Sequence, residues 1–229
     1  MFINKLEQNR NINFFFNKIY HLLLSEKFSK KINFNFDKRS RIDLIQYIIE
    51  NKNYKTYLEI GCHNNEVFDK ISIEKIGVDP VSGGNYRGLS DDFFKENKIN
   101  FDCIFIDGLH EYDQVKRDII NSIKILNKNG MIILHDCLPP SINHQRVPRT
   151  RYSWNGDVWK AIVEARTWGH VNTFTVLADQ GLGVIKKEQN TDKLDLTNTT
   201  FKNLKFKFFY ENYNKIMRTI SYEDFLKII

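Results

Sequence analysis

Cysteine is scarce in this sequence, with only Cys62, Cys103 and Cys137 among 229 residues. No two of them form a CxxC pair, and each lies in or beside a short apolar run. Structural zinc sites and disulfide frameworks need cysteines at characteristic spacings, so the sequence predicts neither. Isolated thiols of this kind indicate a reducing compartment.

Long apolar runs and the glycine-rich nucleotide fingerprint are also missing. No stretch approaches the roughly 20 apolar residues that a membrane-spanning helix needs. Charged residues lie where a signal peptide would have its apolar core, so we expect a cytoplasmic protein without a transmembrane segment. After Gly61, the residues Cys62, His63 and Asn64 stand where the G-x-G-x-x-G fingerprint continues. A pyrophosphate cradle for NAD is therefore not expected.

Acidic residues are outnumbered, since 28 Asp and Glu face 34 Lys and Arg, giving a net charge of +6. A basic balance is compatible with nucleic-acid binding, but here the excess of Lys and Asn is spread evenly along the chain. We therefore expect a small-molecule partner and no nucleic acid. With 41% hydrophobic and 14% aromatic residues, the chain can bury one sizeable core, which predicts one domain with additions at its ends.

Four short apolar runs, each followed by glycine or a polar residue, form the main pattern of the sequence. The runs are Tyr57–Ile60, Ile76–Val78, Phe101–Ile106 and Gly130–Leu134, and they lead into Gly61, Asp79, Asp107 and His135-Asp136. Short runs in which most residues are apolar predict strands buried on both faces of a parallel sheet. Ligands of open α/β sheets bind at the carboxyl ends of the strands, so we predict a functional rim there.

Helical patterns separate these runs. Ser40 is the predicted N-cap of a helix that reaches Asn51, a second helix from Glu111 ends at a C-cap formed by Asn129-Gly130, and Asp157 is the predicted N-cap of a third. Residues 173–177 and 181–185 are so close that they can pair only as antiparallel strands. The order predicts an α/β fold, a Rossmann-like doubly wound mostly parallel sheet closed by an antiparallel C-terminal hairpin.

We predict three parts, an N-terminal helical extension at residues 1–39, a central domain at 40–190 and a C-terminal helical extension at 191–229. Apolar residues recur at helical spacing in the first part. That helix packs on the domain or on a second subunit, covers a ligand as a lid, or contacts a membrane surface. The C-terminal part is interpreted as packing and homo-oligomer surface.

Taken as a set, the motifs resemble those of class I S-adenosylmethionine-dependent methyltransferases. Leu58-Glu-Ile-Gly61 is similar to the first motif of that family, and Gly77-Val-Asp-Pro80 to its acidic ribose-binding position. Phe105-Ile-Asp-Gly-Leu-His110 and Ile133-Leu-His-Asp-Cys137 resemble the methyltransferase-24 subgroup. Many members of that subgroup act in polysaccharide and secondary-metabolite pathways. The resemblance spans residues 40–190 and implies S-adenosyl-L-methionine as cofactor.

The resemblance also implies which residues bind the cofactor. They are Glu59 and Gly61 at the methionine part, Asp79 at the ribose diol, Ser90 and Asp91 near the adenine, and Asp107 near the reacting centre. Two structural alternatives stay open. Asp79 also fits the cap of an Asp-Pro turn, and Ser90-Asp91 also fits the N-cap of the following helix.

Methyl transfer from a sulfonium needs in-line positioning of the nucleophile and removal of its proton. Some relatives bind magnesium through an acid after the fourth strand and an acidic pair after the fifth, and the corresponding residues here are Asp107, His135 and Asp136. Mg²⁺ or another divalent cation is therefore a candidate second cofactor. Without a metal, His110 or His135 is the natural general base, because imidazole titrates near working pH. His110 could instead cap the following helix.

Arg146, Arg149, Arg151 and Trp154 follow directly on the predicted rim. They fit either a solvated loop or a site for a phosphorylated substrate. We therefore expect O-methylation of a small hydroxylated acceptor such as a sugar, nucleotide-sugar or glycan intermediate of surface polysaccharide or natural-product biosynthesis.

Two alternatives are an RNA or DNA methyltransferase and a non-catalytic cofactor-binding partner subunit. Base methyltransferases usually carry an Asn/Asp-Pro-Pro-aromatic motif after the fourth strand, where this chain has Asp107-Gly-Leu-His110. Retention of Glu59, Asp79, Asp107 and Asp136 argues against loss of catalysis.

Overall fold

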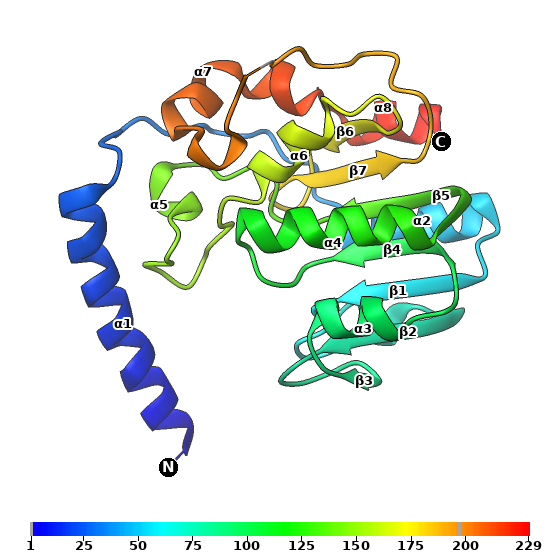
Figure 1. Ribbon diagram of the computed structural model, residues 1–229, viewed down its shortest axis with the longest axis horizontal. Helices are drawn as coiled ribbons and strands as arrows, with labels where there is room; N and C mark the ends of the chain where they lie inside the picture. Colours follow the sequence, from blue (N-terminus) through cyan, green and yellow to red (C-terminus); the bar gives the residue numbers. More distant parts are fainter. Residues whose placement is uncertain (1, 197) are drawn as a thin grey trace.

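The computed structural model describes residues 2–196 and 198–229, with side chains described from residue 10 onward. Its centre is an eight-stranded sheet with the order β3-β2-β1-β4-β5-β7-β6-β8 (Figure 1). The strands are β1 Thr56–Ile60, β2 Glu74–Asp79, β3 Tyr86–Arg87, β4 Phe101–Ile106, β5 Leu126–Leu134, β6 Asn172–Val176, β7 Leu182–Lys186 and β8 Thr219–Ile220. Of these described strands, only β7 runs antiparallel to its neighbours. The predicted mostly parallel sheet with its antiparallel hairpin is confirmed.

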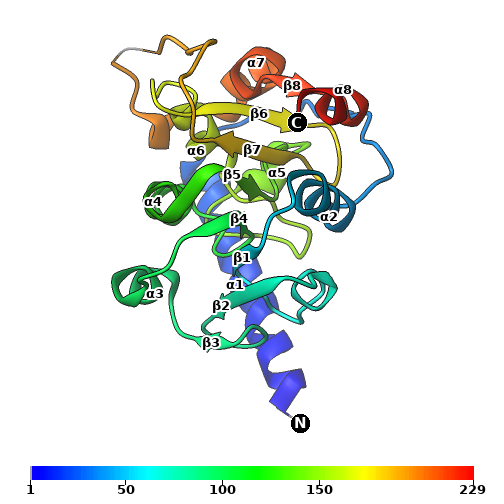
Figure 2. The ribbon, with the colours of Figure 1, turned by 90° about the vertical axis from the view of Figure 1, so that its right-hand side faces the viewer.

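Helices cover both faces of the sheet (Figure 2). They are α1 Phe2–Leu24, α2 Arg41–Lys52, α3 Ser90–Glu96, α4 Tyr112–Ile125, α5 Ile142–Gln145, α6 Trp159–Ala165, α7 Phe206–Met217 and α8 Tyr222–Ile228, with short 3₁₀ turns at Phe68–Lys70 and Phe201–Asn203. Buried residues of α3, α4, α6 and α7 join one apolar cluster, and those of α2 and α8 join the other. The molecule is therefore a three-layer α/β structure.

The strand ends are aligned by the register of the parallel sheet. Ile60 pairs with Val78 on one side and with Ile106 on the other, and Ile106 pairs with Leu134. The residues that come at or just after these positions are Gly61, Asp79, Asp107 and His135. Because they follow paired residues, they lie at one level along the rim, as the sequence predicted.

Two predicted helix boundaries are wrong. The α4 helix ends at Ile125 and β5 begins at once, so Asn129-Gly130 lies within a strand and forms no C-cap. Pairing of Leu126 with Phe101 draws this segment into the sheet. The N-cap of α6 is Val158, whereas Asp157 accepts a hydrogen bond from the Tyr112 amide at 2.7 Å. Asp157 thus satisfies an orphan N–H of α4, which a local pattern does not reveal.

Ser40, in contrast, caps α2 as predicted, with a capping box that includes Asp43. The C-terminal part is not purely helical, because β8 extends the sheet and Phe206, Phe209 and Phe225 are fully buried in the two cores. The proposed domain boundaries remain predictions.

The α1 helix extends along one side of the body (Figure 1). Phe14 and His21 are buried against the protein, whereas Phe15, Phe16 and Leu23 are exposed. Among the described residues, no helix is both long and apolar enough to cross a membrane. The predicted oligomer surface on this helix stays a prediction, which its outward-facing apolar residues favour.

Candidate active site

A cavity of about 280 Å³ opens at the carboxyl ends of β1 and β4, on the side covered by α2. Four residues predicted from the sequence line it together: Glu59, Gly61, Asp107 and His110. Arg41, the first residue of α2, is a further lining residue. Asp79, Ser90 and Asp91 are not part of this lining. The fold therefore gathers the predicted methionine end of the cofactor site and the predicted reacting centre in one place.

Gly61 makes this rim possible by close backbone approach. Its φ is +90°, and a Cβ on it would lie 2.3 Å from the carbonyl oxygen of Asp107. A side chain here would therefore push apart the ends of β1 and β4. The close approach that we predicted toward a ligand is observed toward Asp107.

Glu59 is a buried carboxyl group, 1% exposed, beneath the cavity. Its Oε2 accepts a hydrogen bond of 2.7 Å from the Tyr57 hydroxyl, and it forms no ion pair within the described part of the chain. Burial raises the pKa of Glu59 to about 7, although the Tyr57 hydrogen bond opposes the shift. A cation that enters the cavity would favour the charged form of this side chain.

Asp79 holds a turn. Its Oδ2 accepts from the amides of Cys62 and His63, at 3.1 and 2.9 Å, and its Oδ1 accepts from those of Val81 and Ser82, at 2.7 and 2.8 Å. Burial opposes ionisation, but these hydrogen bonds prevail and lower the pKa of Asp79. A carboxylate has about four lone-pair sites, so the amides already use its capacity. The geometry supports the turn alternative, and the ribose contact stays a prediction.

Ser90 and Asp91 begin α3 but do not cap it, because the N-cap is Leu89. The Ser90 hydroxyl donates to Asp118 at 2.7 Å, and Asp91 pairs with Arg117 at 3.4 Å. Both side chains thus fasten α3 to α4. Their contact with adenine remains a prediction.

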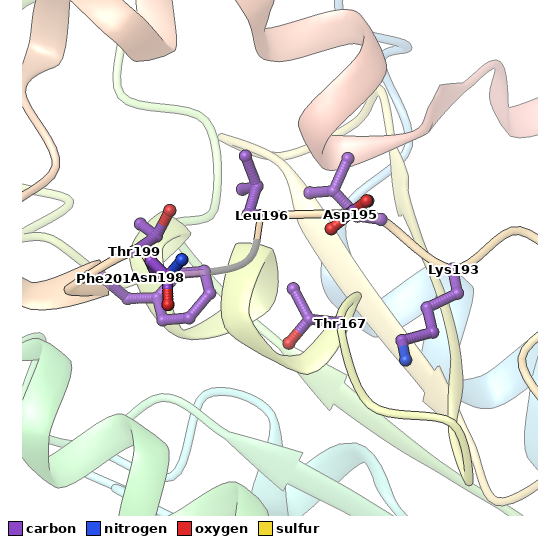
Figure 3. Close-up of a pocket in the computed structure, with 8 residues that line it drawn as sticks. Thr167, Lys193, Asp195, Leu196, Asn198, Thr199 and Phe201 are labelled. Atoms are coloured by element: carbon purple, nitrogen blue, oxygen red, sulfur yellow. The ribbon is translucent and has the colours of Figure 1, made fainter.

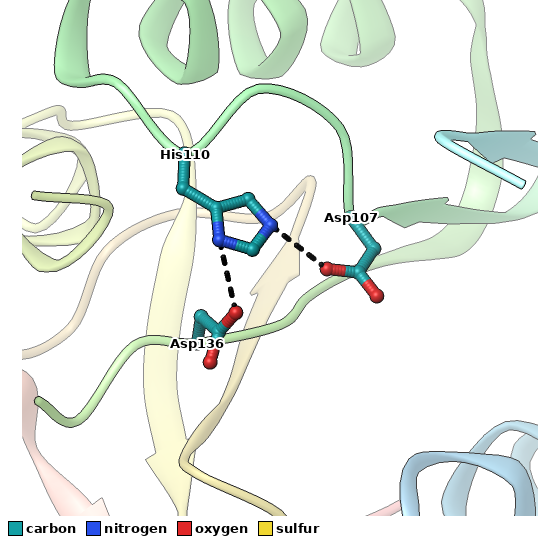
Figure 4. Close-up of side chains that lie close together, drawn as sticks. All are labelled: Asp107, His110 and Asp136. Atoms are coloured by element: carbon teal, nitrogen blue, oxygen red, sulfur yellow. Dashed lines mark hydrogen bonds and ion pairs between the residues drawn. The ribbon is translucent and has the colours of Figure 1, made fainter. Parts of the chain in front are cut away.

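His110 bridges two carboxylates at the centre of the rim (Figure 4). Its Nε2 lies 3.2 Å from Asp107 Oδ1, and its Nδ1 lies 3.0 Å from Asp136 Oδ2. Asp136 adopts a left-handed φ of +61° directly after His135, a conformation that aspartate tolerates better than most residues. The second oxygen of Asp107, Oδ2, accepts no hydrogen bond from any described residue. That oxygen is available to a ligand.

His135 is the second imidazole of the cluster. Its Nδ1 lies 3.3 Å from Asp107 Oδ1, and its Nε2 lies 3.2 Å from Asp179 Oδ1. Asp179 in turn accepts from the Arg41 backbone amide at 2.8 Å. We did not predict Asp179 or Arg41 from the sequence. The β6–β7 hairpin pairs with β5, so the turn of the hairpin lies beside the rim. This pairing could have identified Asp179 from the sequence. No comparable sequence pattern points to Arg41.

The carboxylates and imidazoles of the cluster stabilise one another's charged forms. Burial lowers the pKa of His110, but its hydrogen bonds to Asp107 and Asp136 outweigh burial and raise that pKa to about 10. Burial likewise opposes protonation of His135, yet Asp107 raises its pKa well above the ordinary value. The nearby imidazolium groups overcome the effect of burial and lower the pKa of Asp107. At neutral pH this is a set of carboxylates and imidazolium ions.

The donor set fits a divalent cation poorly. Oxygen and nitrogen atoms of Asp107, His110 and Asp136 lie within 4.8 Å of one another. However, the His110 ring stands between the carboxylates and directs one nitrogen to each, while His135 also contacts Asp107. Metal ligation requires a neutral imidazole and convergent lone pairs, and Mg²⁺ prefers oxygen ligands. The predicted ligand set Asp107, His135 and Asp136 therefore supports no metal-dependent step.

Trp154 connects the cluster to the arginine-rich loop. Its ring stacks on His110 with centroids 5.3 Å apart and an interplanar angle of 17°, and its indole N–H donates to the Arg146 carbonyl at 2.6 Å. Gly156 lets this loop approach, because a Cβ there would lie 1.8 Å from the His110 carbonyl oxygen. The loop and the catalytic candidates thus form a continuous surface.

Another hollow, of about 640 Å³, is lined by Thr167 and by residues 193–196, 198, 199 and 201 (Figure 3). The Thr167 hydroxyl there donates to the Glu164 carbonyl at 2.7 Å. None of the residues at the carboxyl ends of the parallel strands lines this hollow. We therefore place the candidate active site at the smaller cavity.

Comparison with known proteins identifies the domain. Residues 58–137 match the model of the methyltransferase-24 family, which is described as a methyltransferase domain. The matched segment contains Glu59, Asp107 and His110 and the strands that carry them. No curated protein sequence matches the chain. The predicted resemblance to this family is confirmed for the matched segment.

Solved structures confirm the fold. A SAH-bound methyltransferase from Podospora anserina, PaMTH1, is 14% identical with a TM-score of 0.52, covering 65% of this chain and 78% of its own. A proposed caffeoyl-CoA O-methyltransferase from Staphylococcus aureus is 17% identical with a TM-score of 0.52, covering 81% of this chain and 97% of its own. A proposed O-methyltransferase from Klebsiella pneumoniae is 10% identical, with a TM-score of 0.51 and coverages of 65% and 80%. At such identities the likeness establishes the Rossmann-like architecture.

Proposed function

We propose that this chain, which carries a class I methyltransferase domain, binds S-adenosyl-L-methionine and methylates a hydroxyl oxygen of a small acceptor. The observation that carries the proposal is the buried carboxyl group of Glu59, which lines the cavity and forms no ion pair with any described residue. S-adenosylmethionine supplies an electrophilic methyl group on a sulfonium and also carries an ammonium group. PaMTH1, a solved structure with this fold, is bound to SAH, which supports the choice of cofactor.

Glu59 and Gly61 are the proposed contacts of the methionine portion. A cation beside Glu59 offsets the cost of ionising a buried carboxyl group, so the residue favours a positively charged ligand over a neutral one. Phe105 lines the same cavity and supplies an apolar wall. The combination fits a ligand that is cationic at one end and apolar along its length.

Asp107 is the proposed proton acceptor. Its free Oδ2 can accept a hydrogen bond from the acceptor hydroxyl, while His110 and His135 fix Oδ1. As the new C–O bond forms, the hydroxyl proton becomes strongly acidic, so even a carboxylate of lowered pKa can receive it. His110 and His135 then act as positioning cations, because both nitrogens of each ring already face carboxylates.

The acceptor is proposed to be a hydroxylated sugar, nucleotide sugar or glycan intermediate. Support comes from the cationic loop beside the cluster, where Trp154 stacks on His110 and Arg149 lies 5.1 Å from the Trp154 ring. A carbohydrate ring can lie against such an aromatic surface, and a phosphate can pair with guanidinium groups. Surface-polysaccharide or natural-product biosynthesis is the proposed context.

The test is calorimetry of the full chain with S-adenosylmethionine, followed by methyl-transfer assays against phosphorylated sugars and nucleotide sugars. We expect saturable binding of S-adenosylmethionine, loss of affinity in Glu59→Gln, and no binding of NAD. Wild-type protein that binds no S-adenosylmethionine would refute the proposal. Methyl transfer to nitrogen or carbon in the product would refute the assignment of a hydroxyl acceptor.

A further inference from the structure

A third and larger concavity lies between α1 and the loop that follows α5. It has a volume of about 730 Å³, and its lining includes Asn11, Phe14 and Lys18 from α1 and Arg146, Arg151 and Tyr152 from the loop. We call it the basic groove. No carboxylate lines it among the described residues. Its charge is therefore set by one ammonium and two guanidinium groups.

The arginines of this protein fall into two groups. Six of the ten form ion pairs with described carboxylates: Arg39, Arg41, Arg87, Arg117, Arg166 and Arg218. Arg10, Arg146, Arg149 and Arg151 form none within the described part of the chain, and all four lie in or beside the basic groove. Unpaired guanidinium groups that gather at one place indicate a site for an anion from outside the chain.

Arg146 gives the clearest sign of a missing partner. Its Nε is buried and has no hydrogen-bond partner among the described residues. Burial lowers the pKa of the Arg146 side chain, and no described carboxylate pairs with it to offset the lost hydration. Because Arg146 lines the groove and no described residue accepts a hydrogen bond from its guanidinium group, an oxyanion in the groove would supply an acceptor for that group.

The groove is held in shape by α1. Asn17 Nδ2 donates to the Arg149 carbonyl at 2.8 Å, and His21 Nε2 lies 2.7 Å from the Pro148 carbonyl. Phe14 packs edge-on against Tyr152 with centroids 5.2 Å apart. These contacts attach α1 to the loop that carries Arg146, Arg149 and Arg151. They place Lys18 on the wall of the groove.

We infer that the basic groove binds the phosphate or diphosphate group of the methyl acceptor, and that Lys18 of the N-terminal helix completes this subsite. The inference rests on the proposed function and specifies its substrate as a phosphorylated small molecule. Three lining cations match the charge of a diphosphate better than that of an uncharged glycan. Trp154 bridges the two regions, since its N–H contacts the Arg146 carbonyl and its ring stacks on His110. In this proposal the phosphate of the acceptor lies in the groove and its reacting hydroxyl lies near Asp107, with Trp154 between the two regions.

The experiment is calorimetric titration of the full chain with inorganic pyrophosphate, at low and high salt. We expect binding that weakens as salt rises, and affinities about tenfold or more lower in Arg151→Gln and in Lys18→Gln. Arg146→Gln should lose pyrophosphate affinity to a similar extent. Circular dichroism would confirm that each variant is folded. Arg218→Gln, which removes an arginine already paired with Asp192, is the matched control and should bind pyrophosphate normally.

The outcomes separate the groove from the methyl-transfer proposal. If SAH binds and pyrophosphate does not, or if both Arg151→Gln and Lys18→Gln retain full pyrophosphate affinity, the subsite is refuted while the proposed function stands. If pyrophosphate binds through these residues and SAH does not bind, the groove stands as an anion site and the proposed function fails. Binding of a single-stranded oligonucleotide or of phosphatidylglycerol vesicles that pyrophosphate does not displace would refute the small-molecule assignment.

Discussion

Replacing Glu59 by glutamine should stabilise the protein at pH 8 while weakening its binding of the cofactor. Glutamine keeps the shape of the side chain and can still accept the hydrogen bond from Tyr57, but it cannot ionise. Burial raises the pKa of Glu59 from 4.5 to about 7. A carboxyl group with a raised pKa contributes stability that is fully present below its unfolded pKa. That stability is lost as the pH rises through the folded pKa.

The size of the effect follows from that shift. One pKa unit corresponds to about 1.4 kcal/mol, so wild-type protein should lose roughly 2 to 3 kcal/mol of unfolding free energy from this group between pH 5 and pH 8. The Glu59→Gln variant should keep this unfolding free energy over the same pH range. Urea unfolding of both proteins at the two pH values measures the difference, which should be small at pH 5 and clear at pH 8.

Cofactor binding should change in the opposite direction. If Glu59 holds a cationic part of S-adenosylmethionine, loss of a charge-assisted hydrogen bond of about 1.5–3 kcal/mol should weaken binding roughly tenfold or more. Calorimetry with S-adenosylmethionine at pH 8 measures this. A variant that binds as tightly as wild type, or that gains no stability at pH 8, would refute the reasoning.

Glu164 provides a matched control. It is also buried and bonded to a tyrosine hydroxyl, that of Tyr112, but its Oε1 lies 2.6 Å from the Lys116 ammonium. Glu164→Gln breaks an ion pair in which the glutamate is buried and the lysine side chain is 34% exposed, so it should destabilise the protein modestly at pH 8 and leave the affinity for S-adenosylmethionine unchanged.

Four further predictions concern the rim. Asp107→Asn should lower kcat by about 10² or more with little change in cofactor affinity, whereas Asp102→Asn, at the other end of β4, should retain activity. Asp79→Asn should lower the urea midpoint, because an amide group replaces an oxygen that accepts two backbone N–H groups; an unchanged midpoint with weaker cofactor binding would restore the ribose role. Because the pKa of His110 is raised to about 10, its stabilisation should be complete below about pH 6.5 and disappear as the pH approaches 10, and His110→Gln should flatten this melting profile. EDTA should leave methyl transfer unchanged, and lost activity restored by Mg²⁺ would reverse our assessment of the donor set.

The sequence by itself determined the central strands of the sheet and the residues at its rim. Apolar runs such as Phe101–Ile106 are buried on both faces, and a strand of a parallel sheet must end where its neighbours end. It could therefore be predicted, from three separate apolar runs, that Gly61, Asp107 and His135 lie at one level along the rim. The antiparallel hairpin was equally predictable, because its connection is too short for a crossover.

Only the tertiary structure decided the partners of these side chains. Asp157 was expected to cap its own helix and instead accepts the Tyr112 amide, and Asp179, in the hairpin turn, reaches His135. Likewise, the basic groove combines Lys18 with Arg151 across more than a hundred residues of sequence. Periodicity and capping patterns describe neighbours along one element. A hydrogen bond or ion pair between elements depends on how they pack in space, and for that the local pattern carries no signal.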